Sequence, residues 1–205
     1  NKILRSTNFG LSFSTLSQNL KNCNIYCIYK DNNNQIFAGS GGELWWMVPP
    51  FGYPSYHSAG NGNGIFTSID MGNTWESKNS GIPDSTSGIY CISKSFDVSI
   101  FIGTNYSRIY RTTNNGDLWL PVYLNSYSNK YNQIRSIAVN PLNGYIFACG
   151  GLENGGILRS TNNGLNWTLL STNMFFNAKS ISINSQGDIY LGDYAGIFMS
   201  SNNGL

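Results

Sequence analysis

The chain has 205 residues, of which 40% are hydrophobic, 14% aromatic and only 11% charged, with a formal net charge of +2. This length can bury a substantial core, and the aromatic content excludes a disordered chain. The small, scattered charge excludes an electrostatic surface for nucleic acid, and no apolar run reaches the roughly 18 residues of a membrane span. The four cysteines lack CxxC spacing, so neither a zinc site nor a redox pair is indicated. We predict no metal and no cofactor.

One short motif occurs five times, at intervals of about 40 to 60 residues. A hydroxyl residue is followed by Asp or Asn two positions later, by Gly after two more, and by an aromatic residue three positions after the Gly. The last copy lacks its aromatic. The members are Ser6, Asn8, Gly10 and Phe13; Ser68, Asp70, Gly72 and Trp75; Thr112, Asn114, Gly116 and Trp119; Ser160, Asn162, Gly164 and Trp167; and Ser200, Asn202 and Gly204.

The segments between these motifs repeat the same order of β-prone runs. Two runs, strands A and B, are joined by a polar turn and predict a hairpin. A third run, strand C, precedes each motif, and the aromatic of the motif opens strand D. We therefore predict an all-β fold, a β-propeller of four-stranded antiparallel blades with about four to five blade units. The A and B runs are 27–29 with 36–39, 91–93 with 100–103, 136–138 with 146–149, and 180–182 with 189–192; the C runs are 3–5, 65–67, 109–111, 157–159 and 197–199.

The repeat divides residues 1–205 into one continuous propeller segment with incomplete units at both ends. We expect a partial blade at 1–24, blades at 25–88, 89–133 and 134–178, and a partial blade at 179–205. The leftover strands predict that the segment belongs to a larger ring, in a natural protein that continues at both ends. Self-association of two copies to complete a ring is the alternative.

The repeated motif resembles the Asp-box, or BNR repeat, of sialidases, xyloglucanase-type glycoside hydrolases, sortilin-like receptors and photosystem-assembly-factor-like propellers. Ser68 to Trp75 fits that pattern at every defined position, and the other copies substitute Asn for Asp. The resemblance implies a non-catalytic turn between strands C and D at the blade periphery. The residue types agree, because Asp or Asn caps turn N–H groups and Gly permits a positive φ. One acidic residue per turn supplies too few oxygens for a tight calcium site.

The unit at 25–88 carries an insertion of about 20 residues between strands B and C, placed at 40–64 by internal alignment. B–C loops lie on the face opposite the Asp-boxes, which in similar propellers usually carries the ligand site. The insertion could bind a protein or glycan partner through its aromatic residues. It could instead fold on its own aromatics as a plug against the central channel. The predicted ligand-binding residues are Trp45, Trp46, Phe51, Tyr53, Tyr56 and His57.

Two positions on strands A and B predict tight packing near the ring centre. Cys27 and Cys91 align with Ser136 and with the serine at 180, so strand A requires a small residue where the blades converge. On strand B, Cys149 aligns with three glycines. Cysteine there acts as a small hydrophobe, and a reactive thiol is not indicated.

The chain contains no recognisable catalytic set. Glu43, Glu153 and Asp193 all fall in B–C loops and are the candidate carboxylates if the chain is an enzyme, because glycoside hydrolysis uses a carboxylate pair. We predict a non-catalytic secreted or cell-surface propeller scaffold that binds a protein or glycan through the B–C loop face. A fragment of a sialidase- or xyloglucanase-like glycoside hydrolase is one alternative, and a self-assembling structural repeat segment is another.

Overall fold

The computed structural model describes residues 3–16, 20, 24–41, 43–47, 55–59, 63–83, 88–125, 132–152, 155–170 and 178–204, with 43–47 and 55–59 described by their backbone. Every regular element in these ranges is a β-strand. Within the same ranges, no helix is long and apolar enough to cross a membrane.

The strands form five successive antiparallel sheets, which we number as blades 1 to 5, and the three central sheets each contain four strands in the order A, B, C, D. The predicted all-β propeller is therefore confirmed. Blade 1 contains β1 (Leu4–Arg5) and β2 (Ser14–Thr15); blade 2, β3 (Asn24–Lys30), β4 (Ile36–Gly41), β7 (Ile65–Ser68) and β8 (Glu76–Ser77); blade 3, β9 (Ile89–Lys94), β10 (Ile100–Thr104), β11 (Ile109–Thr112) and β12 (Leu120–Tyr123); blade 4, β13 (Ile134–Val139), β14 (Ile146–Gly150), β15 (Ile157–Ser160) and β16 (Thr168–Leu170); and blade 5, β17 (Ser180–Ile183), β18 (Ile189–Asp193) and β19 (Gly196–Ser200).

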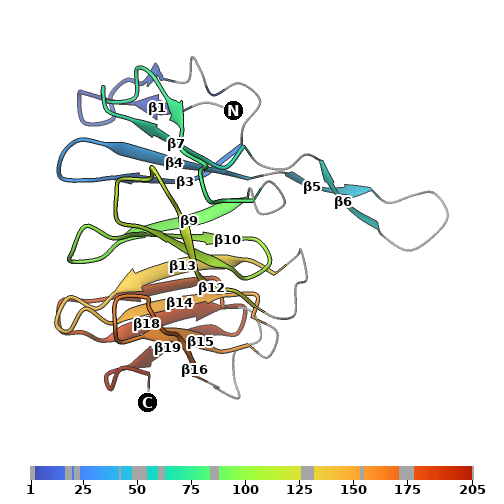
Figure 1. Ribbon diagram of the computed structural model, residues 1–205, viewed down its shortest axis with the longest axis vertical. Coiled ribbons are helices and arrows are strands. Elements are labelled where there is room, and N and C mark those ends of the chain that lie inside the picture. Colours follow the sequence, from blue (N-terminus) through green and yellow to red (C-terminus); the bar gives the residue numbers. More distant parts are fainter. Residues whose placement is uncertain are drawn as a thin grey trace.

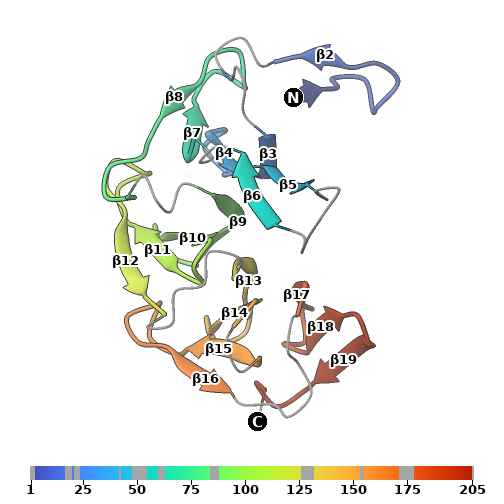
Figure 2. The same ribbon diagram turned by 90° about the vertical axis from the view of Figure 1, so that its right-hand side faces the viewer.

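The blades stack in chain order along the longest axis of the molecule (Figure 1). Seen from the side, they follow an open arc (Figure 2). The A strands β3, β9, β13 and β17 line the inner side of this arc, and the D strands β8, β12 and β16 lie on its outer side. The inner side is the central channel of the propeller segment.

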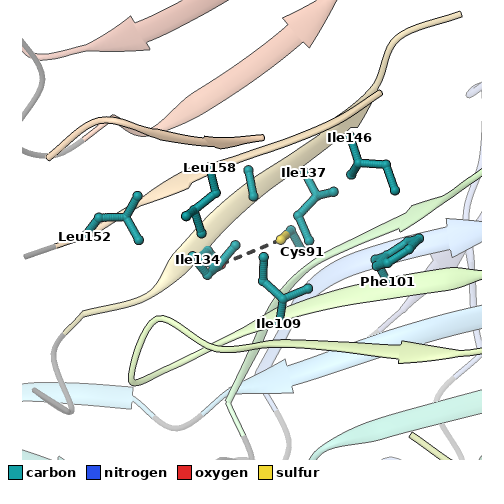
Figure 3. Packing of buried hydrophobic residues seen from close by; sticks show 9 residues of the cluster. Cys91, Phe101, Ile109, Ile134, Ile137, Ile146, Leu152 and Leu158 are labelled. Atoms are coloured by element: carbon teal, nitrogen blue, oxygen red, sulfur yellow. Dashed lines mark hydrogen bonds between the residues drawn. The ribbon is translucent and has the colours of Figure 1, made fainter. Parts of the chain in front are cut away.

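The core lies between neighbouring blades. Between blades 3 and 4, Phe101 and Ile109 pack against Ile134, Ile137 and Ile146 (Figure 3). Side chains alternate between the two faces of each strand, so a B strand such as β10, buried along its whole length, contributes to the interfaces on both sides. Removal of this apolar surface from water is the main force that holds one blade to the next.

The packing predicted for the small residues of strands A and B is confirmed. Cys91 pairs with Gly103, and a β-carbon at Gly103 would lie 2.5 Å from the Cys91 sulfur and 2.6 Å from Ile134. Blade 4 reverses the arrangement, because Ser136 pairs with Cys149 and the sulfur belongs to strand B. Each of these two pairs thus holds one sulfur and one smaller partner. Burial raises the pKa of Cys149 to about 12, which is consistent with an unreactive, packed thiol.

The five repeated turns share one hydrogen-bond pattern. In the second copy, Ser68 Oγ donates to Asp70 Oδ1 at 2.8 Å and accepts from the Gly72 N–H at 2.8 Å. Asp70 Oδ1 also accepts the Thr74 N–H at 2.9 Å. The hydroxyl-to-Asn and Gly-to-hydroxyl bonds recur in the other four copies. These side chains satisfy the turn's backbone donors internally, which explains the fixed residue types.

The residue before each motif glycine is also constrained, although the sequence pattern left that position undefined. It adopts a left-handed conformation in all five copies, with φ between 55° and 60°. Asparagine, which tolerates this region, occupies it in three copies: Asn115, Asn163 and Asn203. Phe9 and Met71 occupy it in the other two and therefore carry backbone strain.

In blades 2, 3 and 4, the motif also packs its blade against the preceding blade. The position of a β-carbon at Gly116 is 3.6 Å from the Phe37 ring of blade 2. Trp119 is fully buried, and its Nε1–H donates to the Lys78 carbonyl at 2.9 Å. The motif tryptophan therefore packs against the neighbouring blade at this interface.

The two end faces of the arc expose surfaces that are buried elsewhere. Ile197 of β19 is 81% exposed, whereas its counterparts Ile65 and Ile109 are fully buried. A β-carbon at Gly192, or at Gly10 in the first motif, would meet no atom within 4 Å. Both ends therefore present the surfaces that form blade–blade interfaces in the middle of the chain.

The insertion differs from its sequence-based description. Ser40 and Gly41 continue β4 and pair with Ile25 and Asn24, so the strand extends into the range assigned to the insertion. The insertion itself contains a two-stranded antiparallel sheet of β5 (Glu43–Met47) and β6 (Ser55–Ala59) instead of a plain loop. This hairpin projects beyond the stacked blades on the side opposite the A–B turns (Figure 1).

Candidate ligand-binding site at the central channel

Three successive inner strands contain a β-bulge at the same place. The register of β3 against β4 shifts between Ile25 and Cys27, which leaves Tyr26 as the extra residue. Equivalent shifts leave Tyr90 as the extra residue in β9 and Arg135 in β13. In blade 5, Lys179 holds the same sequence position, and its N–H donates to the Gly192 carbonyl at 2.8 Å. Bulges change the direction of a side chain relative to the regular pleat and occur often near functional sites.

These four positions belong to one end of the channel. Each lies at or just before the start of its A strand, so it is close to the B–C and D–A connections and distant from the Asp-box turns. The β5–β6 hairpin leaves blade 2 from this same end (Figure 2). We refer to Tyr26, Tyr90, Arg135 and Lys179 as the channel cluster.

The two tyrosines of the channel cluster stack on each other. Their ring centroids are 5.3 Å apart, with an interplanar angle of 28°. A β-carbon at Gly41 would overlap the Tyr26 ring, so that glycine lets the ring lie against the β4 backbone. Burial raises the pKa of Tyr90 to about 12, reinforced by Tyr26 and opposed by Arg135. The stack is therefore a fixed, neutral element of the channel wall.

The basic half of the channel cluster faces Tyr194, which lies in the B–C turn of blade 5. Lys179 Nζ lies 4.6 Å from the centroid of the Tyr194 ring. A hydrogen bond from Lys179, together with the positive charges of Lys179 and Arg135, lowers the pKa of Tyr194. Arg135 Nε is buried and has no hydrogen-bond partner among the residues that the structure describes. Arg108 Nε, in the B–C turn of blade 3, and Arg5 Nε, in blade 1, are also buried without a described partner.

The B–C turn of blade 3 lies at the same end and is strained. Tyr106 and Ser107 both have left-handed backbones, with φ of 58° and 50°. Ser107 holds the turn in place, because its Oγ donates to the Gly151 carbonyl at 2.6 Å and its N–H donates to the Asn132 carbonyl at 3.1 Å. The turn presents Arg108, whose guanidinium lies 5.1 Å from the centroid of the Tyr106 ring. Two such residues cost on the order of 1–3 kcal/mol each, and strain of this kind clusters at functional sites.

The sequence-predicted aromatic residues fall mainly in the hairpin. Its register pairs Trp45 with His57 and Trp46 with Tyr56. The other two predicted ligand-binding residues, Phe51 and Tyr53, lie outside the described residues. The binding role of all six stays a prediction.

The candidate carboxylates are separated in the fold as far as the structure describes them. Glu43 opens β5 and pairs in register with Ala59, and Asp193 ends β18. Asp193 Oδ1 accepts the Ala195 N–H at 2.6 Å, so this side chain caps the B–C turn of blade 5. Glu153 lies outside the described residues.

Sequence reasoning missed the channel cluster. Its members immediately precede the small residues that the internal alignment had matched, so a signal was present in the repeat. The residue types conceal it, because two tyrosines, an arginine and a lysine do not form a recognisable motif. The bulge itself depends on how strand A pairs with strand B, which local sequence does not show.

Comparison with known proteins supports the fold alone. No family description and no curated protein matches the sequence. Among solved structures, the chain is similar to the extracellular domain of BT4673, a hybrid two-component system of B. thetaiotaomicron, with a TM-score of 0.72 and 16% identity over 98% of this chain and 24% of that one. It is also similar to the GH74 xyloglucanase of Xanthomonas campestris, with a TM-score of 0.63 and 13% identity over 88% of this chain and 29% of that one. A third match, YCF48 bound to a D1 peptide, has a TM-score of 0.61 and 14% identity over 99% of this chain and 60% of that one.

These similarities and the sheet topology define a segment of a β-propeller. The chain spans between about a quarter and three-fifths of the lengths of these three structures.

Proposed function

We propose that this chain is part of an Asp-box β-propeller that works outside the cytoplasm as a non-catalytic binding module. Its partner is a protein segment, held at the B–C end of the central channel. The Asp-box assignment is supported by the hydrogen-bond pattern of the five turns, which uses the hydroxyl residue, the Asp or Asn and the Gly of the motif. The extracellular location is supported by the similarity to an extracellular propeller domain.

The observation that carries the binding role is the channel cluster. Successive blades place their bulged residue at one end of the channel, and the stacked tyrosines are fixed before any ligand arrives. A prearranged site loses little conformational entropy on binding. The similar fold of YCF48 has been seen with a D1 peptide, which is consistent with a peptide ligand here.

A peptide-display selection against the purified chain tests this function. Selected peptides should lose binding when Tyr90 is replaced by Ala or when residues 43–59 are replaced by a short turn. They should retain binding to a Leu165→Ala variant, because Leu165 is an exposed residue of an Asp-box at the opposite end. Failure to select any peptide that depends on the B–C end would overturn the proposal.

Self-association is a second candidate, favoured by the exposed end faces. Ile197 and Met199 are 81% and 61% exposed on the last blade. Sedimentation at increasing concentration should then show a dimer that an Ile197→Glu substitution abolishes. A monomer at all concentrations would exclude this role.

The glycoside hydrolase alternative makes a different prediction. The chain should release the aglycone of a chromogenic glycoside, and the Glu43→Gln or Glu153→Gln variant should lose this activity.

A further inference from the structure

Among the described side chains, the ion pairs lie at one end of the channel. At the Asp-box end, two basic side chains have acidic partners, because Lys78 lies 2.8 Å from Asp117 and Arg111 lies 3.8 Å from Asp97. Arg5 and Arg159 at that end bond backbone carbonyls instead. In the A–B turns, Lys94 reaches Asp31 at 4.0 Å.

At the B–C end, by contrast, Arg108, Arg135 and Lys179 form no ion pair with any carboxylate of the described residues. Asp193 is a carboxylate at this end whose side chain the structure describes, and it is engaged with its own turn. Three successive blades therefore each contribute to this end one basic side chain that has no ion pair with a described carboxylate. Charges of one sign that are gathered on one surface concentrate ligands of the opposite sign.

The tyrosine stack restricts what chemistry can complement these charges. An edge of the Tyr26 ring lies against the backbone at Gly41, and Tyr26 and Tyr90 cover one ring face of each other. A sugar ring binds an aromatic residue through an open ring face, and the stack removes one face of each tyrosine from that use.

We propose that the B–C end of the channel binds the carboxylate groups of an acidic peptide segment, held by Arg135 and Lys179 and bordered by the Tyr26–Tyr90 stack. This inference rests on the proposed binding function and specifies its ligand. The planar guanidinium of Arg135 matches a carboxylate with two parallel hydrogen bonds, and Lys179 adds a point charge on the next blade. Arg108, on the strained turn of blade 3, extends the positive surface towards the incoming segment.

Fluorescence anisotropy with a labelled peptide of about ten residues rich in Glu tests this assignment, with the same peptide carrying Gln in place of Glu as the probe control. The Glu peptide should bind and the Gln peptide should not. The combined Arg135→Gln and Lys179→Gln variant should weaken binding of the Glu peptide roughly tenfold or more. Lys94→Gln removes one positive charge at the Asp-box end and should leave binding unchanged.

Several outcomes would overturn the inference. Equal binding of the Gln peptide, or equal loss of affinity in Lys94→Gln, would show that the basic cluster does not select carboxylates. Binding of an oligogalacturonate through Arg135, without binding of the Glu peptide, would assign the site to an acidic glycan instead. Displayed peptides that depend on Tyr90 but show no enrichment in Asp or Glu would overturn this inference and leave the proposed function intact.

Discussion

Gly164 of the fourth Asp-box lies against the ring of Phe101 in the preceding blade, so closely that a β-carbon at position 164 would overlap that ring. The equivalent glycine of the first motif, Gly10, has no atom near the same position, although its backbone is equally left-handed. The motif glycine therefore has two separate roles: it permits the turn, and it leaves space for the neighbouring blade.

The first prediction separates these two roles. Gly164→Ala should destabilise the protein by roughly 2–4 kcal/mol, because left-handed strain adds to the overlap with Phe101. Gly10→Ala should cost only about 1–2 kcal/mol, because the strain acts alone. Urea unfolding of the two variants measures the difference. Equal losses of stability in the two variants would show that contact with the neighbouring blade does not constrain the motif glycine.

The second prediction concerns Met71, which has a left-handed backbone (φ 60°) and a half-exposed side chain. Met71→Asn should stabilise the protein by about 0.5–1 kcal/mol, because asparagine tolerates this conformation. The hydrogen bond from Arg5 to the Met71 carbonyl involves the backbone and should persist. Ile69→Asn, at an exposed position two residues earlier, is the matched control and should not raise the thermal midpoint. If both variants raised the thermal midpoint equally, the cause would be the replacement of an exposed apolar side chain by a polar one, and not the backbone conformation of residue 71.

The third prediction concerns Asp70, the acidic residue among the Asp-box copies. Hydrogen bonds from the Thr74 hydroxyl, the Thr74 N–H and the Ser68 hydroxyl lower its pKa to about 2. Because the folded pKa lies below the unfolded value of about 3.9, the ionised carboxylate stabilises the folded state above pH 4. This contribution falls away as the pH decreases through 2.

Comparison with Asp70→Asn measures that effect. The stability advantage of the wild type should be present at pH 7, decrease between pH 4 and pH 2, and vanish at lower pH. Thr74→Val removes the hydrogen bond from the Thr74 hydroxyl, which is the largest cause of the lowered pKa. The loss of the stability advantage should therefore occur at higher pH in this variant. An advantage that stays constant from pH 7 to pH 2 would contradict the assigned cause of the shift.

The chain's sequence was sufficient to place most of the strands, because the propeller repeats the same local signals. Each strand C ends at a hydroxyl residue such as Ser68, and each motif aromatic such as Trp119 precedes a strand D. The β5–β6 hairpin was not predicted, since its unit has no counterpart in the other blades against which to align it. The left-handed residue before each motif glycine was also missed, because Phe9 and Met71 conceal the preference that Asn163 shows.

The amino-acid sequence by itself determined that this protein is a β-propeller segment with a repeated capped turn, because side-chain-to-backbone hydrogen bonds within eight residues specify each turn locally. Only the tertiary structure decided which residues form the site that we propose for a ligand. The members of the channel cluster are far apart in the chain, and the bulges that direct Tyr26, Tyr90 and Arg135 arise from strand pairing. Stacking of one blade on the next then brings these side chains to one end of the channel, a relationship that no local pattern encodes.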